Sequence, residues 1–208
     1  MIKIITIERE YGCGAAVIAR KTAERLGWKL WDELLTREIA HLSQCEEAEV
    51  VNREERVDPL YYRLFKSILL GSFEGSLNLH RMKILDADSI MRITKQVVDR
   101  AATSGNCVIV GRGSQHFLRD HPDTLRVFLY APRDAKISRL ISEGMDAHQA
   151  EELVDTVDNE RAAFVDKYFH MEWPHRAVYH AMLNTDAGEE AVIQTILGLK
   201  STLEQPAQ

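Results

Sequence analysis

Residues 1–32 carry the sequence pattern that most restricts the fold of this chain. Ile2–Ile7 is a short run rich in β-branched residues, and the turn Gly12-Cys13-Gly14 follows it. From Ala15 the apolar residues recur with helical spacing, and Trp28–Trp31 is a second short apolar run. A strand, a glycine turn, a helix and a strand in this order predict a βαβ unit, which requires a parallel sheet.

Further strand signals lie later in the chain, at Cys107–Val110, Leu125–Ala131 and Ala181–Asn184. Helical patterns separate them, so we expect an α/β fold of three layers around a five-stranded parallel sheet. Residues 33–104 and 133–175 have helical patterns and almost no strand signal, which predicts two helical regions between the strands. We therefore expect a single domain over 1–208, with a core of 1–32, 105–132 and 176–204, a helical insertion (33–104) and a second helical segment (133–175).

Composition excludes some classes of function. The 208 residues include 26 Lys and Arg against 32 Asp and Glu, for a net charge of −6. This balance argues against a protein that coats nucleic acid or an anionic membrane. The chain has 3 widely spaced cysteines and no run of apolar residues long enough to span a membrane, so we expect a soluble protein of the reducing cytoplasm.

The glycine turn is a candidate phosphate-binding site, because backbone N–H groups and a helix N-terminus converge on an anion at this point of a βαβ unit. A full phosphate-loop motif has a glycine five residues before its last one, then a Lys followed by Ser or Thr. Here those positions hold Arg9, Ala15 and Ala16. The turn is therefore either a phosphate site without the usual side chains or an ordinary tight turn. The candidate donor-phosphate residues are Arg9, Gly12, Cys13, Gly14, Ala15 and Ala16, with Arg9 or Arg20 as a replacement for the missing lysine.

Six short segments resemble those of a known family. They are Ile-Thr-Ile-Glu-Arg-Glu-Tyr-Gly-Cys-Gly, Ala-Glu-Arg-Leu-Gly-Trp-Lys-Leu-Trp-Asp, Val-Ile-Val-Gly-Arg-Gly, Leu-Arg-Val-Phe-Leu-Tyr-Ala-Pro, Val157–Arg161 and Leu183–Thr185. With them the chain resembles the cytidylate kinase-like family, relatives of bacterial cytidylate kinase among the nucleoside monophosphate kinases, over nearly its whole length. The resemblance implies a phosphate-loop kinase core, a helical insertion at 33–104 that binds the nucleoside monophosphate, and a helical lid at 133–175.

The resemblance also implies roles for residues that could bind the acceptor. Arg112, in the Gly-Arg-Gly that follows the third strand, matches an arginine that holds the acceptor phosphate. A surface arginine in a turn is the alternative for this residue. Asp32 and Arg37 fall near the segment of the family that contacts the monophosphate, and helix capping or a solvated face is the alternative for both.

In the lid segment, Arg161 is the first catalytic candidate because it matches the family's Asp-x-x-Arg pattern together with Asp158. Arg139 is the second candidate, with Lys136 and Lys167 as supporting cations. For Arg139 and the two lysines the alternative is an exposed, charged helix face.

These residues lead to an expected function with two alternatives. We expect ATP-dependent phosphoryl transfer to CMP, dCMP or a similar small acceptor, with Mg²⁺ held by the phosphates because no metal-binding side chain is identified. An inactive relative that binds a nucleotide or a partner as a sensor is the second hypothesis, because Ala15 and Ala16 replace the loop Lys and Ser or Thr. A kinase with a non-nucleotide acceptor is the third.

Overall fold

The computed structural model describes residues 1–32, 34–35, 37–39, 41–42 and 87–205. Its sheet consists of β1 (Ile4–Arg9), β2 (Lys29–Trp31), β3 (Cys107–Val110), β4 (Thr124–Tyr130) and β5 (Ala181–Asn184). The strands lie in the order β2-β3-β1-β4-β5, and every neighbouring pair is parallel. The predicted five-stranded parallel sheet is confirmed.

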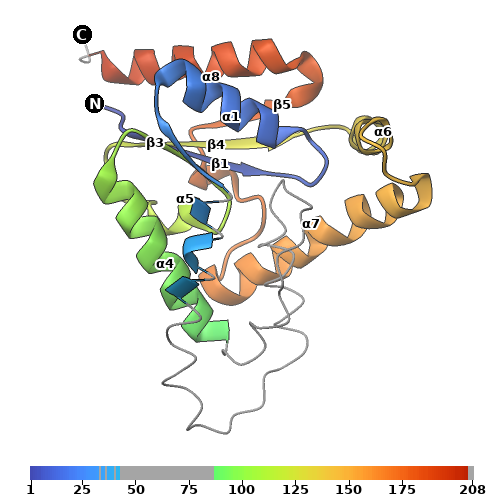
Figure 1. Ribbon diagram of the computed structural model, residues 1–208, viewed down its shortest axis with the longest axis horizontal. Coiled ribbons are helices and arrows are strands. Elements are labelled where there is room, and N and C mark those ends of the chain that lie inside the picture. Colours follow the sequence, from blue (N-terminus) through green and yellow to red (C-terminus); the bar gives the residue numbers. More distant parts are fainter. Residues whose placement is uncertain (33, 36, 40, 43–86, 206–208) are drawn as a thin grey trace, which may run out of the picture.

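Helices cover both faces of the sheet and give the predicted three layers (Figure 1). They are α1 (Ala15–Leu26), α4 (Ala87–Ser104), α5 (Ser114–Phe117), α6 (Arg133–Ser142), α7 (Ala147–Phe169) and α8 (Glu189–Glu204), with 3-10 turns η2 (Arg176–Val178) and η3 (Thr185–Ala187). On one face Ile5 and Ile7 of β1 pack against α1 and α8. On the other face Ile4 and Ile109 pack against α4. The two faces of β1 follow from its alternating side chains.

Strand β1 lies at the centre of the sheet and is buried along its whole length. It runs two residues past the apolar run Ile2–Ile7, through Glu8 and Arg9, whose charged side chains are also buried. Arg9 pairs in register with Leu129 of β4, so the ladder continues beyond the apolar residues. Two charged residues are thereby placed at the carboxyl end of the central strand, the end where open α/β sheets bind ligands.

The turn after β1 has the backbone conformation that its glycines predict. Gly12 and Gly14 have φ angles of 73° and 77°, in the left-handed region that other residues rarely adopt. Helix α1 begins directly after Gly14. The turn therefore delivers the helix N-terminus to the carboxyl edge of the sheet.

The two helical excursions are described to different extents. Most of the predicted insertion 33–104 lies outside the described residues, and α4 is its last part. The predicted lid 133–175 contains α6 and α7, which pack through Ile137, Leu140, Ala150 and Val154. Among the described residues, no helix is both long and apolar enough to cross a membrane.

Candidate active site

The loop after β1 is fastened to helix α7 by Asp158 and Arg161. The Tyr11 N–H donates to Asp158 Oδ1 at 2.9 Å. Arg161 Nη1 donates to Asp158 Oδ1 and to the Arg9 carbonyl, both at 3.0 Å. Since Asp158 and Arg161 lie one turn apart on α7, a single face of this helix covers the loop.

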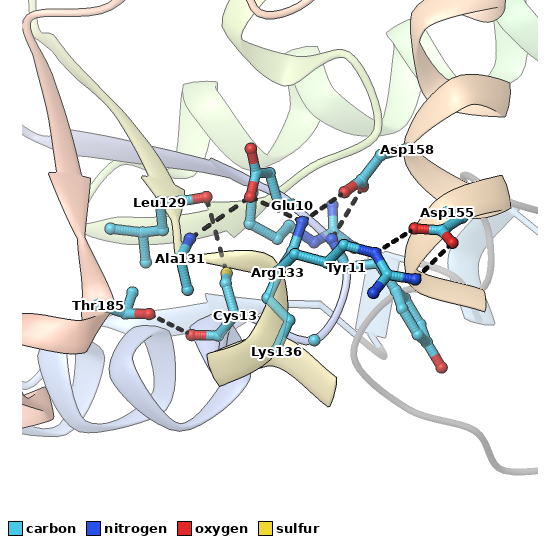
Figure 2. A network of polar contacts seen from close by, with 12 residues as sticks. Glu10, Tyr11, Cys13, Leu129, Ala131, Arg133, Lys136, Asp155, Asp158 and Thr185 are labelled. Atoms are coloured by element: carbon cyan, nitrogen blue, oxygen red, sulfur yellow. Dashed lines mark hydrogen bonds and ion pairs between the residues drawn. The ribbon is translucent and has the colours of Figure 1, made fainter. Parts of the chain in front are cut away.

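Helix α6 places two further cations against the same loop. Lys136 Nζ lies 2.9 Å from Glu10 Oε2 and 3.4 Å from Asp158 Oδ2, so its ammonium bridges the loop and α7 (Figure 2). Arg139 Nη1 donates to the Gly12 carbonyl at 2.9 Å. A Cβ atom at Gly14 would lie 3.1 Å from Arg139 Nε, so the glycine lets this side chain approach the backbone.

An open cavity of about 180 Å³ adjoins the loop on the side of α1. It is lined by Cys13, Gly14, Val17, Ile18, Arg139, Glu143, Thr185 and Glu189. The Thr185 hydroxyl donates to the Cys13 carbonyl at 2.7 Å and thus ties the β5 end to the loop. A loop backbone, a helix N-terminus and a guanidinium at one cavity are groups that bind phosphate.

A second, much smaller cavity lies at the carboxyl ends of β1 and β3, and its volume of about 10 Å³ is close to what one water molecule needs. It is lined by Glu8, Arg9, Arg112, Gly113, Gln115, Arg161, Phe164, Val165 and Trp173. The side chains of Arg9, Arg112 and Arg161 are each at least 95% buried. Glu8 accepts from Arg9 Nη1 at 3.4 Å and from Gln115 Nε2 at 2.8 Å, so one carboxylate faces three guanidinium groups in the lining.

Arg9 reaches this cavity because Gly111 has no side chain. A Cβ atom at Gly111 would lie 1.8 Å from Arg9 Nη1. Within the described residues, Arg9 Nη2 and Trp173 Nε1 are buried without a hydrogen-bond partner, and both residues line the cavity. Buried donors of this kind are normally satisfied by the protein, by an ordered water or by a ligand, so both are candidates to contact an acceptor atom in the cavity.

The electrostatics of this cavity favour an anion. The pKa of Arg112 is lowered to about 9, mainly by burial and then by the charges of Arg9 and Arg161, which Asp32 and Glu8 oppose. The pKa of Arg161 is lowered for the same reasons, burial first and the charge of Arg9 second. An anionic ligand would relieve both the repulsion and the lost hydration.

Other sequence candidates lie in varied surroundings. Arg20 is exposed and pairs with Glu24 at 3.1 Å, which removes it as the replacement for the loop lysine. Arg37 is exposed, and Asp32 is half-buried near Arg112. Lys167 Nζ lies 5.0 Å from the centre of the ring of Tyr168, its neighbour in the sequence.

Cys13 is a packing residue of the loop. Its side chain is 1% exposed, and its thiol donates to the Leu129 carbonyl at 3.6 Å. Burial raises the pKa of Cys13 to about 11, which keeps the thiol protonated and unreactive at neutral pH.

A comparison with protein families decides where the chain belongs. The model of the cytidylate kinase-like family matches residues 4–187. This chain is a member of the cytidylate kinase-like family. No curated protein matches its sequence. Membership supports a nucleotide-dependent phosphotransferase at the level of the family and leaves the acceptor open.

Solved structures show the same fold at low sequence identity. An uncharacterized protein from Eubacterium ventriosum ATCC 27560 is 21% identical with a TM-score of 0.67, and the match covers 97% of this chain and 99% of that one. Shikimate kinase from Bacteroides thetaiotaomicron is 16% identical with a TM-score of 0.53, covering 97% and 99%. A gluconokinase from Sinorhizobium meliloti 1021 is 13% identical with a TM-score of 0.53, covering 97% and 93%. These likenesses establish the phosphate-loop kinase fold.

Sequence reasoning did not single out several residues of the two cavities. Glu8, Gln115, Trp173 and Thr185 of the cavities, and Glu10 of the adjoining loop, received no role of their own from the pattern. Glu8 and Glu10 could have been found, because charged residues at the carboxyl end of a central strand lie where α/β sheets bind ligands. Gln115 and Trp173 join the cavity only through the tertiary fold.

The residues around the loop fit the phosphates of a nucleotide better than a metal ion. The loop offers backbone N–H groups with Lys136, Arg139 and Arg161 around them. Ala16 has no hydroxyl at the position where phosphate loops hold Mg²⁺. The part of the chain that the structure describes has no cluster of three His, Cys, Asp or Glu side chains suited to a metal.

Proposed function

We propose that this chain transfers the γ-phosphoryl group of ATP to a small acceptor that already carries a phosphate, with CMP and dCMP as the first candidates. The observation that carries the proposal is the cavity with Arg9, Arg112 and Arg161 at the carboxyl ends of β1 and β3. Glu8 and Asp158 neutralise part of the charge of these three buried guanidinium groups, and an anionic ligand would offset the rest of the cost of burying them.

The roles of the chain's own residues follow from their positions. The backbone of Gly12–Ala16 binds the donor phosphates, and Arg139 lies against the loop from the lid side. Arg112 binds the acceptor phosphate, with Asp32 and Arg37 at the entry to the insertion. Arg161 contacts the loop carbonyl of Arg9 and also lines the acceptor cavity, so it neutralises the charge that develops between donor and acceptor.

Mg²⁺ would be held by the phosphates of ATP and would neutralise part of their charge. Phosphoryl transfer needs positioning and charge neutralisation more than a nucleophile or a base from the protein. The arrangement of cations on both sides of the loop supplies these two requirements. The buried thiols of Cys13 and Cys107 support the cytoplasm as the compartment in which the protein works.

A second function is favoured by one specific observation. Ala15 and Ala16 remove the side chains that phosphate-loop kinases use on the terminal phosphates and on magnesium. An inactive relative that binds a nucleotide and acts as a sensor fits these two residues. A kinase for a non-nucleotide acceptor is the third hypothesis, and the neighbours described as shikimate kinase and gluconokinase make it worth testing.

The experiment that separates them measures ADP formation from ATP with CMP, dCMP, UMP, cytidine, shikimate and gluconate, together with ATP binding by calorimetry. The proposal expects turnover with a nucleoside monophosphate and none with cytidine. ATP binding without turnover on any acceptor supports the sensor. Turnover with shikimate or gluconate alone supports the third hypothesis, and no nucleotide binding excludes both the kinase and the sensor.

A further inference from the structure

The Asp158 carboxylate is surrounded by hydrogen-bond donors from three parts of the molecule. It accepts from the Tyr11 N–H of the loop at 2.9 Å, and Lys136 of α6 lies 3.4 Å away (Figure 2). It also accepts from Arg161 of α7 at 3.0 Å. A loop N–H, an ammonium and a guanidinium are all donors that bind phosphate in proteins. In the structure, one carboxylate side chain of the protein lies against all three.

The surroundings of Asp158 make it a replaceable occupant. Burial raises the pKa of Asp158 above its usual range, although Arg161, the Tyr11 N–H and Lys136 all act to lower it. The carboxyl side chain is still 17% exposed, so it can rotate towards solvent. Lys136, by contrast, is 9% exposed and is also held by Glu10 of the loop at 2.9 Å.

We propose that Tyr11 N–H, Lys136 and Arg161 form a phosphate subsite, that Asp158 fills it in the free protein, and that a phosphate group of the donor displaces Asp158. Lys136 thereby supplies, from the lid, the cation that the loop lacks at Ala15. Glu10 is a positioning residue that keeps Lys136 beside Gly12 after Asp158 has left. The subsite rests on the proposed function only in that ATP is the source of the phosphate.

Competition from Asp158 lowers the apparent affinity of the subsite for phosphate by an amount that can be calculated. An internal carboxylate that fills the site for 90–99% of the time weakens the apparent affinity for phosphate by about 10- to 100-fold. Removing its charge therefore tightens phosphate binding by about tenfold or more. Removing Lys136 as well abolishes that gain, because the subsite then loses its ammonium donor.

The test measures binding of inorganic phosphate, and separately of ATP, to the full chain by calorimetry. The variants are Asp158→Asn, the double variant Asp158→Asn with Lys136→Gln, and Asp155→Asn as the matched control. Asp155 lies one turn earlier on α7, where it is exposed and pairs with Arg133 at 2.7 Å. Asp158→Asn is expected to bind both probes at least about tenfold more tightly than the unmodified chain, and Asp155→Asn equally tightly.

Affinities of Asp158→Asn and the unmodified chain that agree within twofold, or no phosphate binding by either, overturn the subsite. A gain that survives Lys136→Gln overturns the role of Lys136. If Asp158→Asn binds phosphate more tightly but the unmodified chain turns over no acceptor, the kinase is refuted and the subsite stands. If the unmodified chain turns over an acceptor but Asp158→Asn binds phosphate no more tightly, the subsite is refuted and the kinase stands.

A crystal structure of the unmodified chain with ATP provides a second test that needs no variant. The expected result has phosphate oxygens within hydrogen-bond distance of Tyr11 N and Lys136 Nζ, with Asp158 turned away. A bound nucleotide with Asp158 still on the Tyr11 N–H contradicts the proposal.

Discussion

Gly111→Ala tests the placement of Arg9 in the acceptor cavity. The new Cβ would lie 1.8 Å from Arg9 Nη1 and 2.9 Å from Cζ, so the guanidinium must move. Gly111 also has a φ of +63°, where alanine is strained. The substitution therefore combines a backbone cost with a displacement of Arg9.

Gly27→Ala isolates the backbone cost. Gly27 has the same φ of +63° and has no atom within 4 Å of its Cβ position. We expect this control to lose about 1–2 kcal/mol from the left-handed conformation alone. Gly111→Ala loses about 2–4 kcal/mol more, because moving Arg9 breaks its buried contact with Glu8 at 3.4 Å.

Urea unfolding of both variants measures these free energies, and steady-state kinetics measure the acceptor KM. The KM for CMP is expected to rise by about tenfold or more in Gly111→Ala and to stay unchanged in Gly27→Ala. Equal losses of stability in the two variants, with equal KM values, would refute the placement of Arg9.

Three further predictions follow from buried groups. Arg161→Ala lowers kcat by about 100-fold or more while the ATP Kd changes little, because Arg161 holds both the phosphate and its competitor Asp158; an equal loss in both quantities contradicts its role in transfer. Arg112→Gly changes the free energy of unfolding by less than about 1 kcal/mol, because it removes a buried charge and relieves a residue whose backbone φ is +63°, and both gains offset the lost contacts. The same substitution raises the KM for CMP at least about tenfold, and an unchanged KM would exclude Arg112 from acceptor binding. Burial lowers the pKa of His116 from 6.5 to about 4, so stability present above pH 6.5 is lost as the pH falls towards 4, by about 3 kcal/mol at pH 4. His116→Phe, which preserves stacking on Phe169, should remove that part of the pH dependence in urea unfolding. An unchanged pH profile would show that His116 does not cause the loss of stability at low pH.

The strands were the most predictable part of the fold. β3 and β5 match their predicted bounds, because each is a short, mainly apolar run bounded by turn residues. β3 is buried on both faces of the sheet, whereas β5 is an edge strand and only partly buried. The end of β1 was mispredicted, since Glu8 and Arg9 interrupt the apolar run but stay in the ladder. Charged residues argue locally against a strand, but here Glu8 and Arg9 remain in β1 because they pair with Phe128 and Leu129 of β4.

The candidate site was predictable only in part, for physical reasons. Gly12 and Gly14 are found from sequence because a left-handed turn requires glycine. The contact of Asp158 with the Tyr11 N–H joins residues 147 positions apart, and no local pattern encodes it. For Lys136 the sequence left two possibilities, a supporting cation and an exposed helix face. The structure places it on the loop, and its carboxylate partners Glu10 and Asp158 come from two other parts of the chain that no local pattern brings together.

The central claim is that a phosphoryl group moves from ATP to a phosphorylated acceptor at the cavity of Arg9, Arg112 and Arg161. Phosphorus NMR of the protein with ATP, Mg²⁺ and CMP follows both products at once. The account predicts ADP and CDP in equal amounts, and neither when cytidine replaces CMP. ADP without a phosphorylated acceptor, or bound ATP that stays intact with every nucleoside monophosphate, would contradict it.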